Sequence, residues 1–281
     1  MKPVRPLIGI FDSGIGGLSV LREIRSLLPA QPLLYFADQA HVPYGSRNIE
    51  EVLEFSLGIT RYLLDQGAKL IVVACNTASV AALKNLREVY PDIPFVGMEP
   101  AVKPAAEQTR SSVVGVLATQ ATFHTAMYAS VVERFAHGVT ILEDPCPGLV
   151  AQIEKGDLEG SEIRVILENA LTPMLEKGVD TVVMGCTHYP FVIPLIRQIV
   201  GPDVQVIDPA PAVARQVRRM LEARQLLANG RHRAAARFAT TGDPAHFQAM
   251  VKQLLSEAHT IEPKAWRDDR VVDLPESQEN L

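Results

Sequence analysis

The chain has 281 residues, of which 47% are hydrophobic and 21% are charged, a composition typical of a globular protein. The formal net charge is -5, with acidic and basic residues mixed along the chain, so nothing in the sequence predicts a nucleic-acid-binding surface. No stretch approaches the roughly 18 apolar residues of a membrane span, and the apolar run near the N-terminus is too short for a signal peptide. We therefore expect a cytoplasmic protein that binds neither membranes nor nucleic acid.

Short apolar runs alternate with segments of helical period along the chain. Strand-like runs at 6–11, 33–37, 69–75 and 94–98 are separated by helical patterns at 17–28, 48–66 and 77–90. A second series has strands at 112–118, 138–143, 180–186 and 204–208, with helices near 121–135, 161–177 and 190–199. Continuous apolar runs are typical of strands buried on both faces. The order predicts an α/β fold with mainly parallel sheets flanked by helices.

The chain length favours roughly two domains, and a proline-rich segment after residue 98 begins the second series. We expect two similar α/β lobes, one formed by 1–99 together with 212–262 and the other by 100–211. Residues 212–262 would add helices and a strand near 235–240 back onto the first lobe. The segment 263–281 is predicted to be a polar, weakly ordered C-terminal tail, in which Trp266 could provide a local anchor.

Two of the three cysteines follow look-alike strands. Cys75 ends "KLIVVAC" and Cys186 ends "DTVVMGC", about one domain apart. Cys146 lies between two prolines and is interpreted as structural. In the cytoplasm all three should be free thiols, and the absence of any C-x-x-C spacing argues against a disulfide framework or a zinc site.

In open α/β sheets, ligands bind beyond the carboxyl ends of the strands. Four predicted loops lie there: "FDSGIGG" (11–17), "VPYGSR" (42–47), "ACNTAS" (74–79) and "GCTHYP" (185–190). The first lacks the G-x-G-x-x-G spacing of a dinucleotide site, so it predicts a tight turn with Ser13 near a helix N-cap, where backbone N–H groups could bind a carboxylate. Asp12 could cap this turn or take part in chemistry.

Each strand-end cysteine is followed by hydrogen-bonding side chains, Asn76 and Thr77 in one loop and Thr187 and His188 in the other. Free cysteines are often simply buried, but a helix N-terminus or a cationic histidine favours the reactive thiolate. If two lobes face each other across a cleft, their thiols approach one ligand from opposite sides. One can remove a proton from a stereocentre while the other delivers one, which is a two-base racemisation that needs no cofactor or metal.

Five ordered motifs give the chain a resemblance to the glutamate racemases, the cofactor-independent enzymes that interconvert L- and D-glutamate for bacterial peptidoglycan. They are "FDSGIGGLSV", "VPYGSR", "VVACNTAS", "GVLATQAT" and "VMGCTHYP", between about residues 7 and 210. The resemblance implies an active site between the lobes, glutamate as substrate, and a homodimer. Some members carry a regulatory N-terminal extension. We expect no such site here, since the first strand begins about six residues into the chain.

The resemblance also implies roles for individual residues. Cys75 and Cys186 would be the acid/base pair, with Asp12 assisting on the Cys75 side. On the other side His188 would assist, held by Glu154 from "LVAQIEKG". Substrate contacts would come from a larger set of polar residues and one glycine: Asp12, Ser13, Tyr44, Gly45, Asn76, Thr77, Thr119, Thr122, Thr187 and His188.

Two alternatives stay open. An aspartate or hydantoin racemase would have the same lobes and paired thiols, and pocket size would distinguish it. A thiol hydrolase or lyase would use Cys186 with His188 alone and leave Cys75 dispensable.

Overall fold

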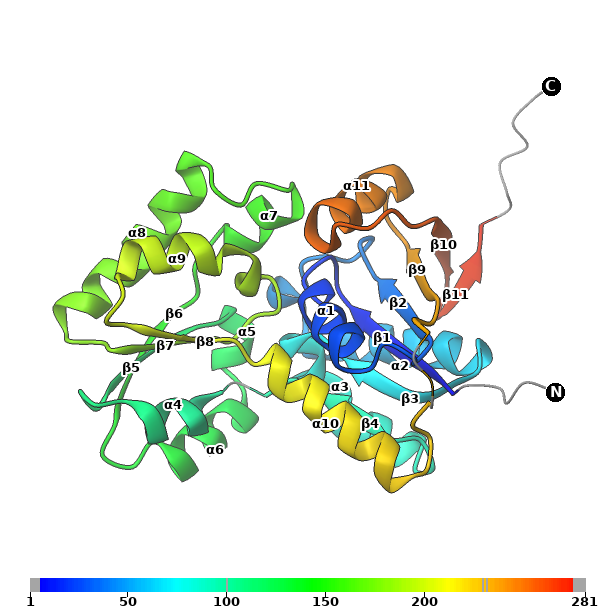
Figure 1. Cartoon of the computed structure of the whole chain (residues 1–281), viewed down its shortest axis with the longest axis horizontal. Coiled ribbons are helices and arrows are strands. Elements are labelled where there is room, and N and C mark those ends of the chain that lie inside the picture. The colour runs from blue at the N-terminus through cyan, green and yellow to red at the C-terminus, as the bar shows by residue number, and fades with distance from the viewer. Residues whose placement is uncertain (1–5, 100, 229, 231, 275–281) are drawn as a thin grey trace.

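The structure is a computed structural model that describes residues 6–99, 101–228, 230 and 232–274. Figure 1 shows two lobes side by side, each built on its own sheet. The seven-stranded sheet has the order β11-β10-β9-β2-β1-β3-β4, and only the β10–β11 pair is antiparallel. Its strands are β1 (Leu7–Asp12), β2 (Leu33–Ala37), β3 (Ala68–Val73), β4 (Phe95–Gly97), β9 (Ala236–Thr240), β10 (Ile261–Arg267) and β11 (Arg270–Asp273).

Helices cover both faces of this first sheet because neighbouring strand residues point to opposite sides. Ile8 and Ile10 belong to a buried cluster with one set of helices, whereas Phe11 belongs to a second cluster on the other face. The first set consists of α1 (Leu18–Leu27), α10 (Ala210–Ala223) and α11 (Pro244–Leu255). The second set consists of α2 (Ile49–Asp65) and α3 (Asn76–Val89), preceded by the short helix η1 (Tyr44–Ser46).

The second lobe repeats this layering on four parallel strands in the order β6-β5-β7-β8. The strands are β5 (Val113–Leu117), β6 (Thr140–Asp144), β7 (Thr181–Met184) and β8 (Gln205–Ile207). One face is covered by α4 (Val102–Gln108) and α6 (Ala126–Phe135), with α5 (Gln120–Phe123) before α6. The other face is covered by α7 (Leu149–Glu154), α8 (Ser161–Glu176), η2 (Tyr189–Val192) and α9 (Ile193–Val200). The predicted fold class, α/β with mainly parallel sheets, is confirmed.

We propose the division into lobes predicted from the sequence, because residues 1–99 and 212–262 supply most of one sheet and residues 100–211 supply all of the other. The expected tail differs from the structure. Residues 263–273 form most of β10 and all of β11, while 275–281 lie outside the described residues. Trp266 explains this order, since its ring packs against Gly58 of α2 and its Nε1 donates to Asp38 Oδ1 at 2.8 Å.

Two predicted helices also differ in detail. The helix expected at 121–135 is divided into α5 and α6, because Thr125 accepts a hydrogen bond from the backbone N–H of Tyr128 and caps a new helix there. The helix expected at 190–199 begins as the 3₁₀ helix η2. Ser13 is not an N-cap, since α1 begins after Gly17 and Ser13 instead donates to Asp12.

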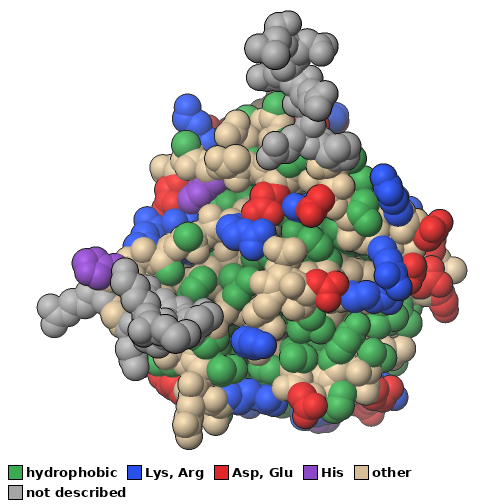
Figure 2. Space-filling view, turned by 90° about the vertical axis from the view of Figure 1, so that its right-hand side faces the viewer, with side chains coloured by type: hydrophobic (Ala, Val, Ile, Leu, Met, Phe, Trp, Pro, Cys, Tyr) green, Lys and Arg blue, Asp and Glu red, His purple; other side chains and the backbone are tan. Residues whose placement is uncertain are grey.

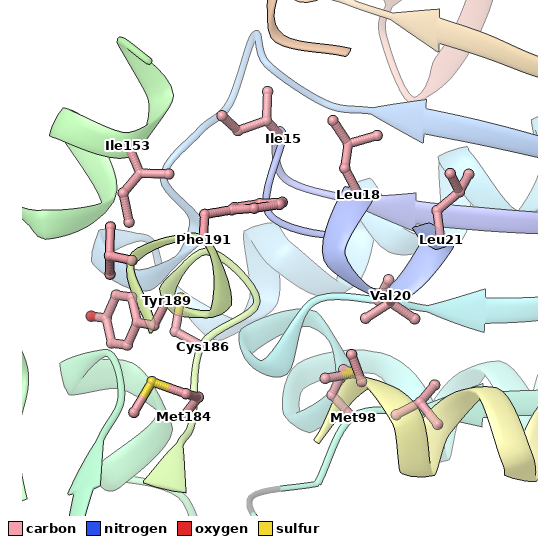
Figure 3. Packing of buried hydrophobic residues seen from close by; sticks show 14 of the residues in the cluster. Ile15, Leu18, Val20, Leu21, Met98, Ile153, Met184, Cys186, Tyr189 and Phe191 are labelled. Atoms are coloured by element: carbon pink, nitrogen blue, oxygen red, sulfur yellow. The ribbon is translucent and has the colours of Figure 1, made fainter. Parts of the chain in front are cut away.

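The hydrophobic core is continuous between the lobes. One cluster of buried residues contains Ile15 and Leu18 from the first lobe together with Ile153 and Phe191 from the second. In Figure 3 the Phe191 ring lies below Ile15 of the β1–α1 loop, to the right of Ile153 on α7 and above Cys186. The lobes therefore contact each other through packed apolar side chains beside one of the two strand-end cysteines.

The outer surface is mixed in charge. On the face shown in Figure 2, Lys and Arg side chains are interspersed with Asp and Glu, and apolar side chains lie between them. Among the residues that the structure describes, no helix is both long and apolar enough to cross a membrane.

Candidate active site

A small pocket lies between the two lobes, at the carboxyl ends of their strands. Its walls come from the loops after β1, β3, β5 and β7 and from η1 and α7, and the cavity measures about 20 Å³. Cys75 and Cys186 both line it, and each is only 6% exposed. The other lining residues are Ser13, Pro43, Tyr44, Gly45, Asn76, Thr77, Thr119, Val150, Thr187 and His188.

Cys75 occupies the N-cap position of α3, where its Sγ accepts the backbone N–H of Ala78 at 3.5 Å. A helix N-terminus favours a thiolate, but burial and the nearby charge of Asp12 outweigh this effect. Together they raise the pKa of the Cys75 thiol well above its ordinary value. Cys75 is therefore a protonated thiol at neutral pH in this arrangement.

Cys186 lies beside an ion pair. His188 Nδ1 is 3.7 Å from Cys186 Sγ, and His188 Nε2 is 2.6 Å from Glu154 Oε1. Burial alone would lower the pKa of His188, but the hydrogen bonds to Cys186 and Glu154 outweigh it and raise the pKa well above 6.5. Burial likewise favours a neutral Glu154, yet His188 and the Ile15 N–H hold the pKa of its carboxyl below its usual range. The pair is thus charged at neutral pH, with the imidazolium directed at the sulfur.

Asp12 is fully buried at the end of β1 and joins the two lobes. Its Oδ1 accepts the Ser13 N–H at 2.6 Å, and its Oδ2 accepts the Thr187 hydroxyl at 2.9 Å. Burial raises the pKa of the Asp12 carboxyl, opposed by the charge of His188 and the bond from Thr187. Asp12 lies behind the pocket rather than among the residues that line it.

The remaining predicted contact residues lie in the walls of the pocket or directly behind them. Thr119 Oγ1 lies 3.3 Å from Thr77 Oγ1 across the lobes and 3.1 Å from Thr122 Oγ1, so Thr122 is placed behind Thr119. Asn76 lines the pocket and is 4% exposed, and neither polar atom of its side chain has a hydrogen-bond partner among the described residues. Because an unpaired buried amide is costly, its atoms are available to a polar ligand. Tyr44 and Gly45 close the pocket opposite Thr119.

The sequence analysis missed two residues of this region that follow β2. Asp38 is buried, and its Oδ2 accepts the Tyr44 hydroxyl at 2.7 Å, which fixes one wall of the pocket. Gln39 donates to Glu154 Oε2 at 3.3 Å. Asp38 follows an apolar strand just as Asp12 does, so the strand-end rule could have identified it. The position of Gln39 depends on the packing of distant segments, and no local signal indicated it.

Comparison with known proteins identifies the class to which this fold and pocket belong. A family profile described as Asp/Glu/hydantoin racemase matches residues 8–217. The chain belongs to this family of racemases.

Individual relatives are more specific. The chain is 52% identical over 254 residues to a glutamate racemase from Pseudomonas paraeruginosa, covering 90% of this chain and 96% of that protein. The solved structure of glutamate racemase isoform RacE1 from Bacillus anthracis superposes with a TM-score of 0.83 at 30% identity, over 94% of this chain and 98% of that one. The Escherichia coli glutamate racemase, solved with L-glutamate and the activator UDP-MurNAc-ala, gives 0.80 at 31% identity over 92% and 97%.

Proposed function

We propose that this chain is an isomerase that interconverts L- and D-glutamate by proton transfer at the α-carbon, and so supplies D-glutamate for peptidoglycan. The observation that carries the proposal is that Cys75 and Cys186, from equivalent strand ends in two lobes, line one pocket. The relatives named glutamate racemase, at 52% identity over most of the chain, support glutamate as the substrate.

The reaction follows from two sulfurs that face one substrate. The thiolate of one cysteine takes the α-proton, so the C–H bond breaks and its electron pair remains on the α-carbon. The thiol of the other cysteine then donates its proton to the opposite face, which forms the new C–H bond and leaves that sulfur as the thiolate. Proton exchange with water resets the two sulfurs, and no electron is gained or lost.

Polar groups around the pocket would hold the substrate and stabilise the carbanion. The α-proton of an amino acid is only weakly acidic, so donors aimed at the developing charge are required. The unpaired amide of Asn76 and the hydroxyls of Thr77 and Thr119 are candidates, together with the backbone at Ser13 and at Tyr44–Gly45. The Thr187 hydroxyl donates to Asp12, so it would accept a bond from the substrate ammonium group instead. Thr122 would act through Thr119, and Asp12 through Thr187.

The proposal is tested by proton NMR of metal-stripped protein in D₂O with L-glutamate, and with L-aspartate in parallel. We expect loss of the glutamate α-proton signal and appearance of D-glutamate without any added cofactor. Exchange with aspartate alone would keep the chemistry and replace the substrate. Exchange with neither would reject the racemase proposal and favour a hydrolase or lyase that uses Cys186 and His188.

Substitution of either pocket cysteine tests the two-base mechanism. We expect Cys75→Ser and Cys186→Ser each to lower racemisation by about 10³-fold or more, because loss of one acid/base group typically costs 10²–10⁴-fold. The matched control is Cys146→Ser, since Cys146 is also buried but does not line the pocket. Near-normal turnover in either pocket variant would contradict the two-base assignment.

The same proposal includes a cytoplasmic homodimer, as the resemblance implies. All three cysteines are free in the structure, and a reducing compartment would keep them so. Light scattering coupled to gel filtration tests the assembly. A mass near that of one 30.7 kDa chain would contradict the dimer.

A further inference from the structure

Glu154 belongs to the second lobe by sequence, but most of its hydrogen-bond partners belong to the first. It is the last residue of α7, which lies beside α11 of the first lobe in Figure 1. Its carboxylate accepts two bonds at Oε1, from His188 Nε2 at 2.6 Å and from the Ile15 N–H at 2.8 Å. Of these two donors, Ile15 comes from the β1–α1 loop, across the boundary between the lobes.

Gln39 holds the second carboxylate oxygen. Its Nε2 donates to Glu154 Oε2 at 3.3 Å, and its own Oε1 accepts the hydroxyl of Thr240 at 2.8 Å. Thr240 ends β9, which pairs with β2 directly before Gln39. The Gln39 amide is therefore fixed at both ends, and its orientation toward Glu154 is determined by the first sheet.

His246 holds the main chain of Glu154. Its Nε2 is 2.8 Å from the Glu154 carbonyl oxygen, and since a carbonyl can only accept, His246 must donate. His246 lies in the first turn of α11. Three parts of the first lobe thus donate hydrogen bonds to the carboxylate or the backbone of Glu154. Among the described residues, His188 is the only second-lobe side chain bonded to that carboxylate.

We propose that Gln39 and His246 are positioning residues for the reaction: they fix Glu154 from the first lobe and thereby orient His188 toward the sulfur of Cys186. The inference rests on the proposed function, because it concerns how one of the two proton-transfer groups is aligned. Displacement of a catalytic group by about 1 Å can cost up to 10²-fold in rate. Because these hydrogen bonds come from the first lobe, Glu154 keeps all of them only while the two lobes are in contact.

The test compares His246→Leu, His246→Gln and Gln39→Leu with the control Gln248→Leu. Gln248 is an exposed residue of the same helix, and its amide donates to a carbonyl away from α7, that of His259. We expect His246→Leu and Gln39→Leu each to lower kcat roughly 10-fold, with KM changed less than about twofold. His246→Gln should recover most of the loss, because its amide N–H can donate to the same carbonyl. Gln248→Leu should match the wild type.

Isotope effects distinguish positioning from a loss of stability. With α-deuterated L- and D-glutamate, misaligning His188 should raise the primary isotope effect for the enantiomer whose deuteron Cys186 removes, because that step becomes slower. For the other enantiomer Cys186 delivers the proton after the C–D bond has broken, so the isotope effect should not rise and should fall if that delivery becomes rate-limiting. Unaltered kcat and isotope effects in His246→Leu would overturn the proposal. The proposal would also be overturned if His246→Leu and His246→Gln lost kcat equally and both losses were explained by a lower urea midpoint of unfolding.

A readout independent of turnover separates this inference from the proposed function. The ring ¹⁵N signals of His188 should shift in His246→Leu and stay in place in Gln248→Leu. If the wild type fails to exchange glutamate, the proposed function fails, yet these signals still decide whether His246 orients His188. Unshifted signals in His246→Leu would overturn the positioning role.

Discussion

Cys75 and Cys186 end look-alike strands but lie in different electrostatic surroundings. Burial and the charge of Asp12 raise the pKa of the Cys75 thiol, whereas the sulfur of Cys186 faces an imidazolium that Glu154 keeps charged. The site is therefore asymmetric although each lobe supplies one sulfur. A cation placed near Cys75 would oppose the charge of Asp12 and favour the Cys75 thiolate.

The raised pKa of His188 predicts a pH-dependent stability. A group whose pKa rises on folding stabilises the fold fully below its unfolded pKa of about 6.5 and loses that contribution as the pH rises through the folded pKa. We expect His188→Asn to lower the free energy of unfolding by about 3 kcal/mol near pH 6, because it leaves the partly buried Glu154 carboxylate without its charged partner. The loss should shrink on the alkaline side.

Urea unfolding of the wild type and His188→Asn, at about pH 6 and about pH 9, measures this difference. The exposed His124 provides the control, since His124→Asn should change the free energy of unfolding little at either pH. A His188→Asn difference that stays constant with pH would show that the pair contributes no charge-dependent stability.

At the scale of elements, the β1–α1 loop shows why its glycines are required. The sequence predicts a tight turn there, but the space available for a side chain in this loop is limited by residues of the other lobe. A Cβ on Gly14 would lie 1.9 Å from Glu154 Oε1, and one on Gly16 would lie 2.4 Å from His188 Nδ1. Side chains at these positions would occupy the space that the Glu154–His188 pair now fills.

Gly14→Ala should therefore impair both activity and stability. The added Cβ meets the carboxylate of Glu154, which must move away, and His188 then loses its partner. We expect kcat to fall roughly 10- to 100-fold, and the urea midpoint to fall as well, because the ion pair is broken. Gly67→Ala is a contrasting control, since its φ is +89° and nothing lies within 4 Å of the added Cβ, so it should strain the backbone and leave kcat unaltered. Wild-type kcat in Gly14→Ala would contradict the prediction.

The elements differed in how well the sequence predicted them. Runs such as "KLIVVAC" predict their strands because both faces are buried, and the strand-end rule then places Cys75 and Cys186 at the carboxyl ends of their two sheets. The β10–β11 hairpin was missed, since Pro263, Lys264 and Trp266 give no regular alternation and its order depends on contacts with α2 and Asp38. The hydrogen bonds from Gln39 and His246 to Glu154 likewise join segments about 90 to 115 residues apart, so no local pattern predicts them.

At the scale of the whole molecule, the lobes are closed over the pocket. A cavity of about 20 Å³ holds little more than one water molecule. Gly45 of the first lobe lies against Thr119 of the second, with a distance of 2.9 Å from its ideal Cβ position to the Thr119 Cβ. An amino acid can enter only if these contacts separate. In the order of the described elements, the chain passes between the lobes twice, between β4 and α4 and between β8 and α10. We predict that the lobes move apart about these connections.

Hydrogen–deuterium exchange with and without D-glutamate measures this motion. If the free protein opens to admit substrate, the backbone amides of 12–16, 44–46 and 119–122 should exchange faster without ligand and become protected together when it binds. Protection should appear in both lobes, because the pocket walls come from both. The amides at the N-terminal ends of β5 and β7, at the edge of the sheet opposite the pocket, should be unchanged and serve as an internal reference. Protection confined to one lobe would mean that glutamate binds without closure, and Glu154 would then be held by the first lobe before substrate arrives.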